Sequence, residues 1–167
     1  IADSLDLSAL KEYSCEIGRP DTVTAKKLEI LKSGGVTRVC INTQSTNNAV
    51  LSKIGRNHTF IDYQRAMDTA LSMGFKSINT DLIAGLPSDT VESFLKSLSD
   101  VITLGADNIT VHTLAIKRAS QLSQDINNFS AKSNQTEKMI DYSYNMLKDA
   151  GFLPYYIYKQ KNAVSNS

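Results

Sequence analysis

The chain has 167 residues, which suits one globular domain, because domains commonly run to roughly 100–200 residues. Its 41% hydrophobic content fits a packed core, and its formal net charge of +1 indicates neither a nucleic-acid nor an acidic-membrane partner. No apolar run approaches the roughly 18 residues that span a bilayer, and no signal peptide is visible.

Strand-like and helix-like runs alternate from the start of the chain. The first expected strands are Glu12–Ile17 and Arg38–Asn42. Between them a helix carries AKKLEILKSG; Asp21 or Thr22 can cap its start, and a Gly-Gly pair ends it where a left-handed residue is wanted.

The same alternation continues through the middle of the chain. The expected elements are a short helix Asn47–Ile54, a helix Phe60–Met73, a strand Ser77–Ile83, a helix opened by Asp89 or Thr90 that runs to Leu104, and a strand Asn108–Leu114. A polar stretch around Gln124–Gln135 predicts a loop or linker. An amphipathic helix Lys138–Ala150 and a short strand Tyr155–Tyr158 complete the prediction.

Repeated strand–helix–strand units predict an α/β fold with parallel strands joined by right-handed crossovers. Two architectures fit this pattern: part of a (β/α) barrel, or a doubly wound open sheet. No glycine-rich phosphate fingerprint follows the first strand, which weakens the open-sheet dinucleotide interpretation.

The two cysteines, Cys15 and Cys40, each fall in an apolar strand-like run. We expect both to be reduced and buried, because a free cysteine packs as a small hydrophobic residue; a disulfide or a metal pair is the alternative. Reduced cysteines suggest a cytoplasmic protein. Because the chain begins at Ile1 rather than at methionine, we expect an excised piece of a longer protein.

Polar residues interrupt the apolar pattern near the ends of the expected strands. They are Glu16, Asn42, Gln44, Asp81 and His112. The carboxyl ends of parallel strands lie on one side, so these groups would converge on a common mouth. Asp81, inside INTDLIAGLP, is the most unexpected of them, because a buried carboxylate is costly unless it is paired or hydrogen-bonded.

Each of these residues also has a purely structural interpretation. Asp81 could cap backbone amides of the LIAGLP loop or pair with a lysine or arginine, and Glu16 could pair with Arg19. Arg56 could be a solvated residue or a helix C-cap. Both histidines lack the spaced partners of a metal site and are interpreted as structural. The case for a site therefore depends on shared location rather than on any single residue.

Several stretches, taken in order, resemble one known superfamily. EYSCEIGRPDTVT, RVCINTQS, LSKIGRNHT, INTDLIAGLPSDT and ITVHTLAIKRAS are similar to segments of the radical S-adenosyl-L-methionine (SAM) enzymes. The resemblance is greatest to the oxygen-independent coproporphyrinogen III oxidases, also called coproporphyrinogen dehydrogenases. It runs from about Glu12 to Leu122, and INTDLIAGLP is its most specific piece.

This resemblance implies a partial (β/α)6 TIM barrel with a 4Fe-4S cluster held by a Cys-x3-Cys-x2-Cys loop after the first strand. The chain contains no such loop, and its two cysteines cannot replace one. The simplest account is that residues 1–122 supply strands three to six of the parent barrel. Residues 123–167 would then form a linker, an amphipathic helix and a short strand that follow the barrel.

The resemblance also assigns cofactor-binding roles, all toward SAM. Glu16 matches the acidic residue that faces SAM from the third barrel strand, and Gln44 matches a polar residue near the ribose and methionyl part. Arg56 matches the arginine that receives the SAM carboxylate. Asp81 matches an acid near the ribose hydroxyls or amine, and the backbone at Ile83 matches the segment beside the adenine.

The implied chemistry belongs to the cofactor. In the family, a reduced cluster passes an electron to SAM, and the resulting 5′-deoxyadenosyl radical abstracts hydrogen from a propionate of coproporphyrinogen III. Loss of carbon dioxide and an electron leaves a vinyl group. No residue of this chain need act as a catalytic acid or base, and no electron donor is indicated. Candidate contacts for the anionic porphyrinogen are Lys117, Arg118, Lys159 and Lys161.

Three functions remain open at this point. The first is the coproporphyrinogen oxidase. The second keeps the fold but changes the role, to a heme chaperone or a radical enzyme with another substrate. The third is a non-catalytic α/β metabolite-binding domain, which the absence of cluster cysteines from the chain favours.

Overall fold

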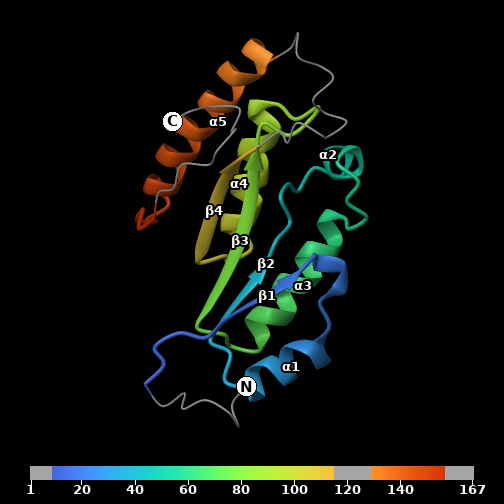
Figure 1. Cartoon of the computed structure of the whole chain (residues 1–167), viewed down its shortest axis with the longest axis vertical. Helices are drawn as coiled ribbons and strands as arrows, with labels where there is room; N and C mark the ends of the chain where they lie inside the picture. Colours follow the sequence, from blue (N-terminus) through green and yellow to red (C-terminus); the bar gives the residue numbers. More distant parts are fainter. Residues whose placement is uncertain (1–8, 115–128, 157–167) are drawn as a thin grey trace.

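The computed structural model describes residues 9–114 and 129–156, with side chains described from residue 134 onward in the second range. Its strands form one parallel sheet in the order β1-β2-β3-β4 (Figure 1). The strands are β1 (Ser14–Gly18), β2 (Arg38–Ile41), β3 (Ser77–Ala84) and β4 (Asn108–Thr113).

Helices connect and flank these strands. They are η1, a short 3-10 turn (Pro20–Thr22), α1 (Ala25–Ser33), α2 (Asn48–Lys53), α3 (Phe60–Ser72), α4 (Val91–Thr103) and α5 (Phe129–Asp149). The expected elements from β1 to β4 are confirmed, with ends that differ by no more than two residues in most cases.

Strand order decides between the two architectures. Neighbouring strands follow one another in the chain, and each pair is parallel. Right-handed crossovers between strands in this order place every connecting helix on the same face. A doubly wound sheet needs a reversal of strand order, and the described strands have none. The fold is therefore the α/β arrangement of part of a barrel, and it agrees with the radical SAM fold expected from the sequence.

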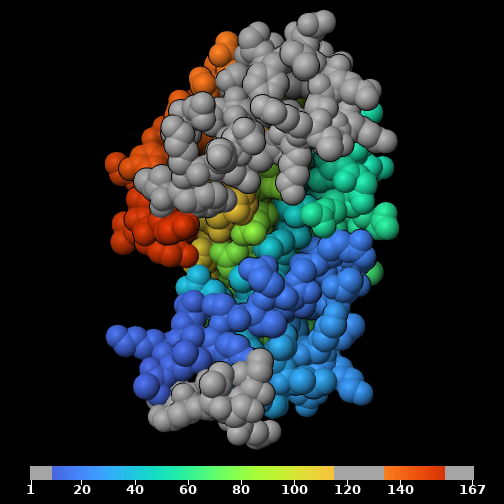
Figure 2. All heavy atoms as spheres, viewed as in Figure 1, coloured from blue at the N-terminus to red at the C-terminus, as the bar shows by residue number. Residues whose placement is uncertain are grey.

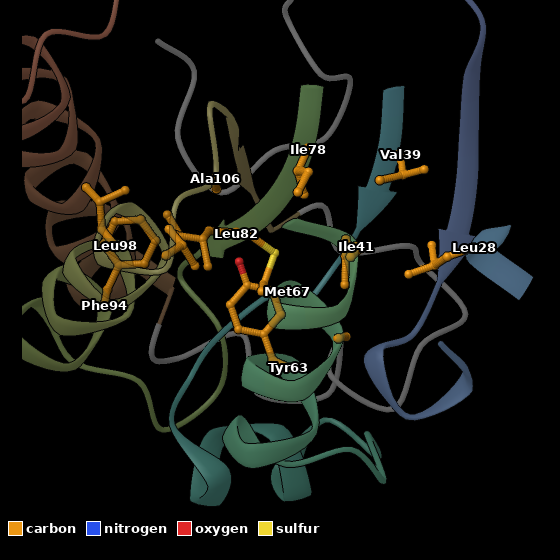
Figure 3. Packing of buried hydrophobic residues seen from close by; sticks show 14 of the residues in the cluster. Leu28, Val39, Ile41, Tyr63, Met67, Ile78, Leu82, Phe94, Leu98 and Ala106 are labelled. Carbon is orange, nitrogen blue, oxygen red and sulfur yellow. The ribbon is translucent and has the colours of Figure 1, made fainter. Parts of the chain in front are cut away.

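Alternation along the strands divides the sheet into an apolar and a polar face. Val39, Ile41, Ile78, Leu82 and Ala84 point to the apolar face and are at most 4% exposed. Helices α1, α3 and α4 cover this face with leucine, methionine and aromatic side chains (Figure 3). Burial of this cluster supplies the main driving force for folding.

Threonine hydroxyls begin the longer helices. Thr59 accepts a hydrogen bond from the Asp62 amide at the start of α3, and Thr90 accepts one from Ser93 at the start of α4. The cap expected for α1 at Asp21 or Thr22 is wrong. Those residues form the η1 turn instead, so the helix begins later, where Thr24 accepts from the Lys27 amide.

Helix α5 begins at Phe129, so the linker expected around Gln124–Gln135 is wrong over its second half. The helix is stabilised by docking rather than by its own amphipathic pattern. Thr136 and Met139 are at most 1% exposed, and the Met139 sulfur accepts a hydrogen bond from the Gly85 amide at 3.3 Å. Because this anchor lies at the carboxyl end of β3, α5 packs beside α4 near that end of the sheet (Figure 1).

The strand expected at Tyr155–Tyr158 does not form over its first two residues, and the rest lies outside the described residues. The Tyr155 hydroxyl instead accepts hydrogen bonds from Asn108 at 2.9 Å and from Arg38 at 3.4 Å. Side-chain bonds therefore hold this segment where a strand would use backbone bonds. Among the described helices, none is long and apolar enough to cross a membrane.

We expect Gly85→Ala to destabilise the chain by about 2 kcal/mol more than Gly35→Ala. Both glycines have positive φ, +84° and +85°, so each substitution carries a left-handed penalty of about 1 kcal/mol. Only at Gly85 would the new Cβ lie 2.5 Å from Thr136 Oγ1, an overpacking cost of about 1–3 kcal/mol. Urea unfolding followed by circular dichroism measures both variants; equal losses would contradict the docking of α5.

Candidate functional site

The polar face of the sheet is opposite the helices. Its residues are Glu16 from β1, Arg38 and Cys40 from β2, Asn79 and Asp81 from β3, and Thr110 and His112 from β4. In Figure 2, atoms of β2, β3 and β4 reach the visible surface side by side in the middle of the molecule. A sheet that buries one face and lines the other with polar groups can hold a polar ligand.

Asn42, just past the end of β2, joins the two expected acidic residues. Its Nδ2 donates to Glu16 Oε2 at 3.0 Å, and its Oδ1 accepts from the Asp81 amide at 3.2 Å. One side chain thus spans β1, β2 and β3. The structural alternative for Glu16 is wrong, because Arg19 pairs with Asp21 at 3.1 Å instead.

Gln44 lies beside Asp81 through the backbone. After β2 ends, the Gln44 amide donates to the Asp81 carbonyl at 2.9 Å, and the Ile83 amide donates to the Gln44 carbonyl at 3.1 Å. Gln44 adopts φ +67°, which non-glycine residues seldom do. The fully buried Thr43 secures this turn, because its hydroxyl donates to the Ser45 carbonyl at 2.6 Å. Strained backbone of this kind tends to occur at functional sites.

Side chains from two strands surround the Asp81 carboxylate. Asn79 Nδ2 donates to Oδ1 at 2.9 Å, and His112 Nε2 lies 3.5 Å from Oδ2. Burial alone would raise the pKa of Asp81, but the His112 and Asn79 contacts outweigh burial, and the pKa is lowered overall. The expected structural alternatives, loop capping and a lysine or arginine partner, do not apply; the side chains that contact the carboxylate are His112 and Asn79, and Asp81 is held ionised.

Arg56 is half-buried in the loop after α2. Among the described residues no carboxylate forms an ion pair with its guanidinium. Two residues further on, the buried His58 places Nε2 3.1 Å from the Thr43 carbonyl, which ties this loop to the Gln44 turn. The structure thus joins Glu16, Gln44, Asp81 and Ile83 through hydrogen bonds, and among the described residues Arg56 is connected to them through the loop that carries His58.

The cysteines do not form a metal site. Cys40 is buried on the polar face, and burial, reinforced by the neighbouring Glu16, raises the pKa of its thiol to about 12. Cys15 is only half-buried, which corrects the expectation that both would be buried; it lies on the edge strand and packs against the helix side. Both are free, and within the described ranges no cluster of three histidine, cysteine or acidic side chains could hold a metal.

Comparison with known proteins agrees with this geometry. The family profile described as the radical SAM superfamily matches residues 3–101. The chain belongs to the radical SAM superfamily. Over 162 residues it is 37% identical to the oxygen-independent coproporphyrinogen-III oxidase-like protein HemZ of Bacillus subtilis, a match that covers 96% of this chain and 32% of that protein.

Other relatives place the chain in the same group of radical SAM proteins. It is 34% identical over 110 residues to the heme chaperone HemW of Bacillus subtilis, covering 66% of this chain and 29% of the relative. The structure of coproporphyrinogen III oxidase (HemN) from Escherichia coli superposes with a TM-score of 0.73 at 25% identity, covering 85% of this chain and 33% of that one. The chain therefore spans about a third of the length of these relatives.

The sequence did not identify the residues that support the acidic side chains. The sequence marks Asn42 and His112 only as polar residues near strand ends, and it predicts no role for Asn79 or Thr110. A signal for Asn79 was present, because residues two apart on a strand share a face and Asn79 precedes Asp81 by two. His112 gave no such signal, since its neighbour Asp81 belongs to another strand.

The buried His58 predicts loss of stability in mild acid. Burial lowers the pKa of His58 below its usual value, despite the Thr43 contact. Between the folded and unfolded pKa values the unfolded chain therefore binds more protons, and stability falls as pH drops below about 6.5. His58→Gln keeps a donor for the Thr43 carbonyl and does not titrate. Urea unfolding at pH 7.5 and 5.5 should show a smaller acid loss in this variant; equal losses would contradict the assignment.

Proposed function

We propose that this chain forms the SAM-holding part of an oxygen-independent coproporphyrinogen III oxidase. The observation that carries the proposal is a set of hydrogen-bonded polar residues near the carboxyl ends of the strands, which we call the polar edge. Glu16, Gln44 and Asp81 follow one another across the ends of three adjacent strands, joined by Asn42 and by backbone bonds. Sites in parallel α/β folds form at the carboxyl ends of the strands, where these residues lie.

Each side chain suits one part of SAM. The Arg56 guanidinium, which lacks a carboxylate partner among the described residues, can donate two hydrogen bonds to the SAM carboxylate. Asp81, held ionised, accepts from ribose hydroxyls or the amine, and Glu16 accepts from the ammonium side. Gln44 would contact the ribose and methionyl part, and the Ile83 backbone would contact the adenine. These residues bind and orient the cofactor.

The residues of this chain do not fit a 4Fe-4S cluster. Iron–sulfur clusters are bound by cysteine thiolates, and the Cys40 thiol is held protonated by a pKa of about 12. Cys15 lies on the opposite side of the sheet. The cluster ligands of the proposed enzyme therefore come from outside this chain, and we assign no step of the electron transfer to its residues.

Bound SAM would supply, in the proposed enzyme, the 5′-deoxyadenosyl radical that starts conversion of two of the four propionates of coproporphyrinogen III to the vinyls of protoporphyrinogen IX. The 37% identity to the coproporphyrinogen-III oxidase-like HemZ supports this substrate, which belongs to heme biosynthesis. The candidate substrate cations, Lys117, Arg118, Lys159 and Lys161, lie outside the described residues. The free cysteines support a reducing, cytoplasmic location.

A second function, heme trafficking, is favoured by a separate observation. The chain is 34% identical over 110 residues to the heme chaperone HemW. A chaperone could use the same fold and the same SAM site without decarboxylating a porphyrinogen. The two functions differ in their effect on the tetrapyrrole, so one assay distinguishes them.

That assay uses the full-length protein that contains this chain, with its cluster reconstituted under anaerobic conditions. We expect conversion of coproporphyrinogen III to protoporphyrinogen IX with release of carbon dioxide, measured by chromatography. The 167-residue chain by itself should give no product, because it cannot bind the cluster. Stable heme binding without decarboxylation would replace the oxidase with the chaperone.

Substitutions at the polar edge test the SAM site directly. In the reconstituted full-length protein, Asp81→Ala and Arg56→Ala should each weaken SAM binding about 10-fold or more, because each removes a hydrogen bond to a charged group. Isothermal titration calorimetry measures the affinity. Asp68→Ala and Arg65→Ala, exposed residues of α3 on the other side of the sheet, are the matched charge controls. Unchanged affinity in both site variants would defeat the assignment.

A further inference from the structure

The contact between His112 and Asp81 is a feature of the polar face that the proposed SAM contacts do not explain. His112 lies on β4 and Asp81 on β3, and the distance from Nε2 to Oδ2 is 3.5 Å, which is long for a hydrogen bond. Their side chains are 28% and 22% exposed, so the pair is accessible from the open face and is partly shielded from water.

Strand register brings the two residues together. Asp81 is directly opposite Thr110, and His112 is opposite Ile83. His112 is thus the diagonal neighbour of Asp81, and alternation directs both side chains to the polar face. An imidazole has the length to cover this diagonal. The contact would be lost if β3 and β4 shifted by one residue, because one of the two side chains would then point into the helices.

The two oxygens of Asp81 are held from opposite directions along the sheet. Asn79 donates to Oδ1 at 2.9 Å from the amino-terminal side, and His112 contacts Oδ2 from the carboxyl-terminal side. Thr110 secures Asn79, because its hydroxyl donates to Asn79 Oδ1 at 3.4 Å. A carboxylate can accept about four hydrogen bonds, so it can serve a ligand while these side chains fix its plane.

The charge of Asp81 depends on the same neighbours. Burial raises the pKa of this carboxyl group, and His112 is the first of the contacts that lower it below its usual value. The other ionisable groups on this face do not take over that role. Glu16 is an acid, Cys40 has a raised thiol pKa, and Arg38 pairs with Glu12 at 2.8 Å near the amino-terminal end of the sheet.

We propose that His112 is a positioning residue, which orients the Asp81 carboxylate for SAM. The inference rests on the proposed function, because it concerns the same site. His112 acts through Asp81 and makes no contact of its own with SAM. Its contribution should therefore vanish when Asp81 no longer carries a charge, whereas a packing role would remain.

A double-mutant cycle with SAM as the probe tests this dependence. His112→Phe keeps an aromatic ring and removes both nitrogens, and Asp81→Asn keeps the size of the side chain and removes its charge. In the reconstituted full-length protein, His112→Phe should weaken SAM binding about 5-fold, since it removes a partly exposed polar contact to a charged group. In the Asp81→Asn background the same substitution should change the affinity less than 2-fold, roughly the additivity error of such cycles.

His112→Gln provides the rescue, because its side-chain amide can again donate toward Asp81. We expect its SAM affinity to return to within about 2-fold of wild type. Circular dichroism melting of each variant separates loss of folding from loss of binding. If His112→Phe does not fold, His112→Asn, which is polar but too short to reach Asp81, takes its place in the cycle.

The outcomes separate the inference from the proposed function. If the wild-type protein binds SAM and His112→Phe binds equally well, or loses as much in the Asp81→Asn background, the positioning role is wrong and the SAM site remains. If the folded, cluster-loaded wild-type protein does not bind SAM, the proposed function fails, and this inference fails with it.

Discussion

The pairing of four parallel strands in chain order is the constraint on which the rest of the structure depends. It places α1, α3 and α4 on one face and leaves the other face to polar side chains. Strand pleating then sorts residues by position along each strand. Leu82 is completely buried among the helices, whereas its neighbour Asp81 lies on the open face. The same backbone thus builds the core and the candidate site, and neither can shift in register without the other.

Asn42 shows that hydrogen bonds, rather than apolar packing, hold the polar face in place. Its amide satisfies Glu16 on β1 and the Asp81 backbone on β3, so one side chain fixes the spacing of three strands. The turn at Gln44 makes two backbone hydrogen bonds to β3. Hydrogen bonds of the buried Thr43 and His58 side chains stabilise this turn. Such a preorganised edge lowers the cost of ligand binding, because little remains to be ordered.

Membership of the radical SAM superfamily and the proposed SAM site do not by themselves distinguish an oxidase from a heme chaperone. The chain is similar to proteins of both kinds, and it spans about a third of their length. The described elements carry the proposed SAM site. The docking of α5 at the end of β3, through Thr136 and Met139, holds this helix against the same end of the sheet.

The sequence by itself determined the repeating strand–helix units, the α/β class and the candidate residues Glu16, Gln44, Arg56, Asp81 and Ile83. The units and the class follow from local patterns, such as alternation and glycine stops, which need no knowledge of distant contacts, whereas the roles of the five candidate residues come from the resemblance to the radical SAM superfamily. The ends of the elements from β1 to β4 were also close to those predicted, apart from the N-cap of α1, which the η1 turn displaced.

Only the tertiary structure decided the start of α5, the segment at Tyr155 and the partners of the acidic side chains. A polar stretch becomes helical when distant residues dock it, as Gly85 docks Met139, and no local pattern records that contact. In the same way, His112 is 31 residues from Asp81 in the chain and becomes its neighbour only through the register of β3 and β4. Pairing between strands is a non-local property, so the chemistry that depends on it appears only in the fold.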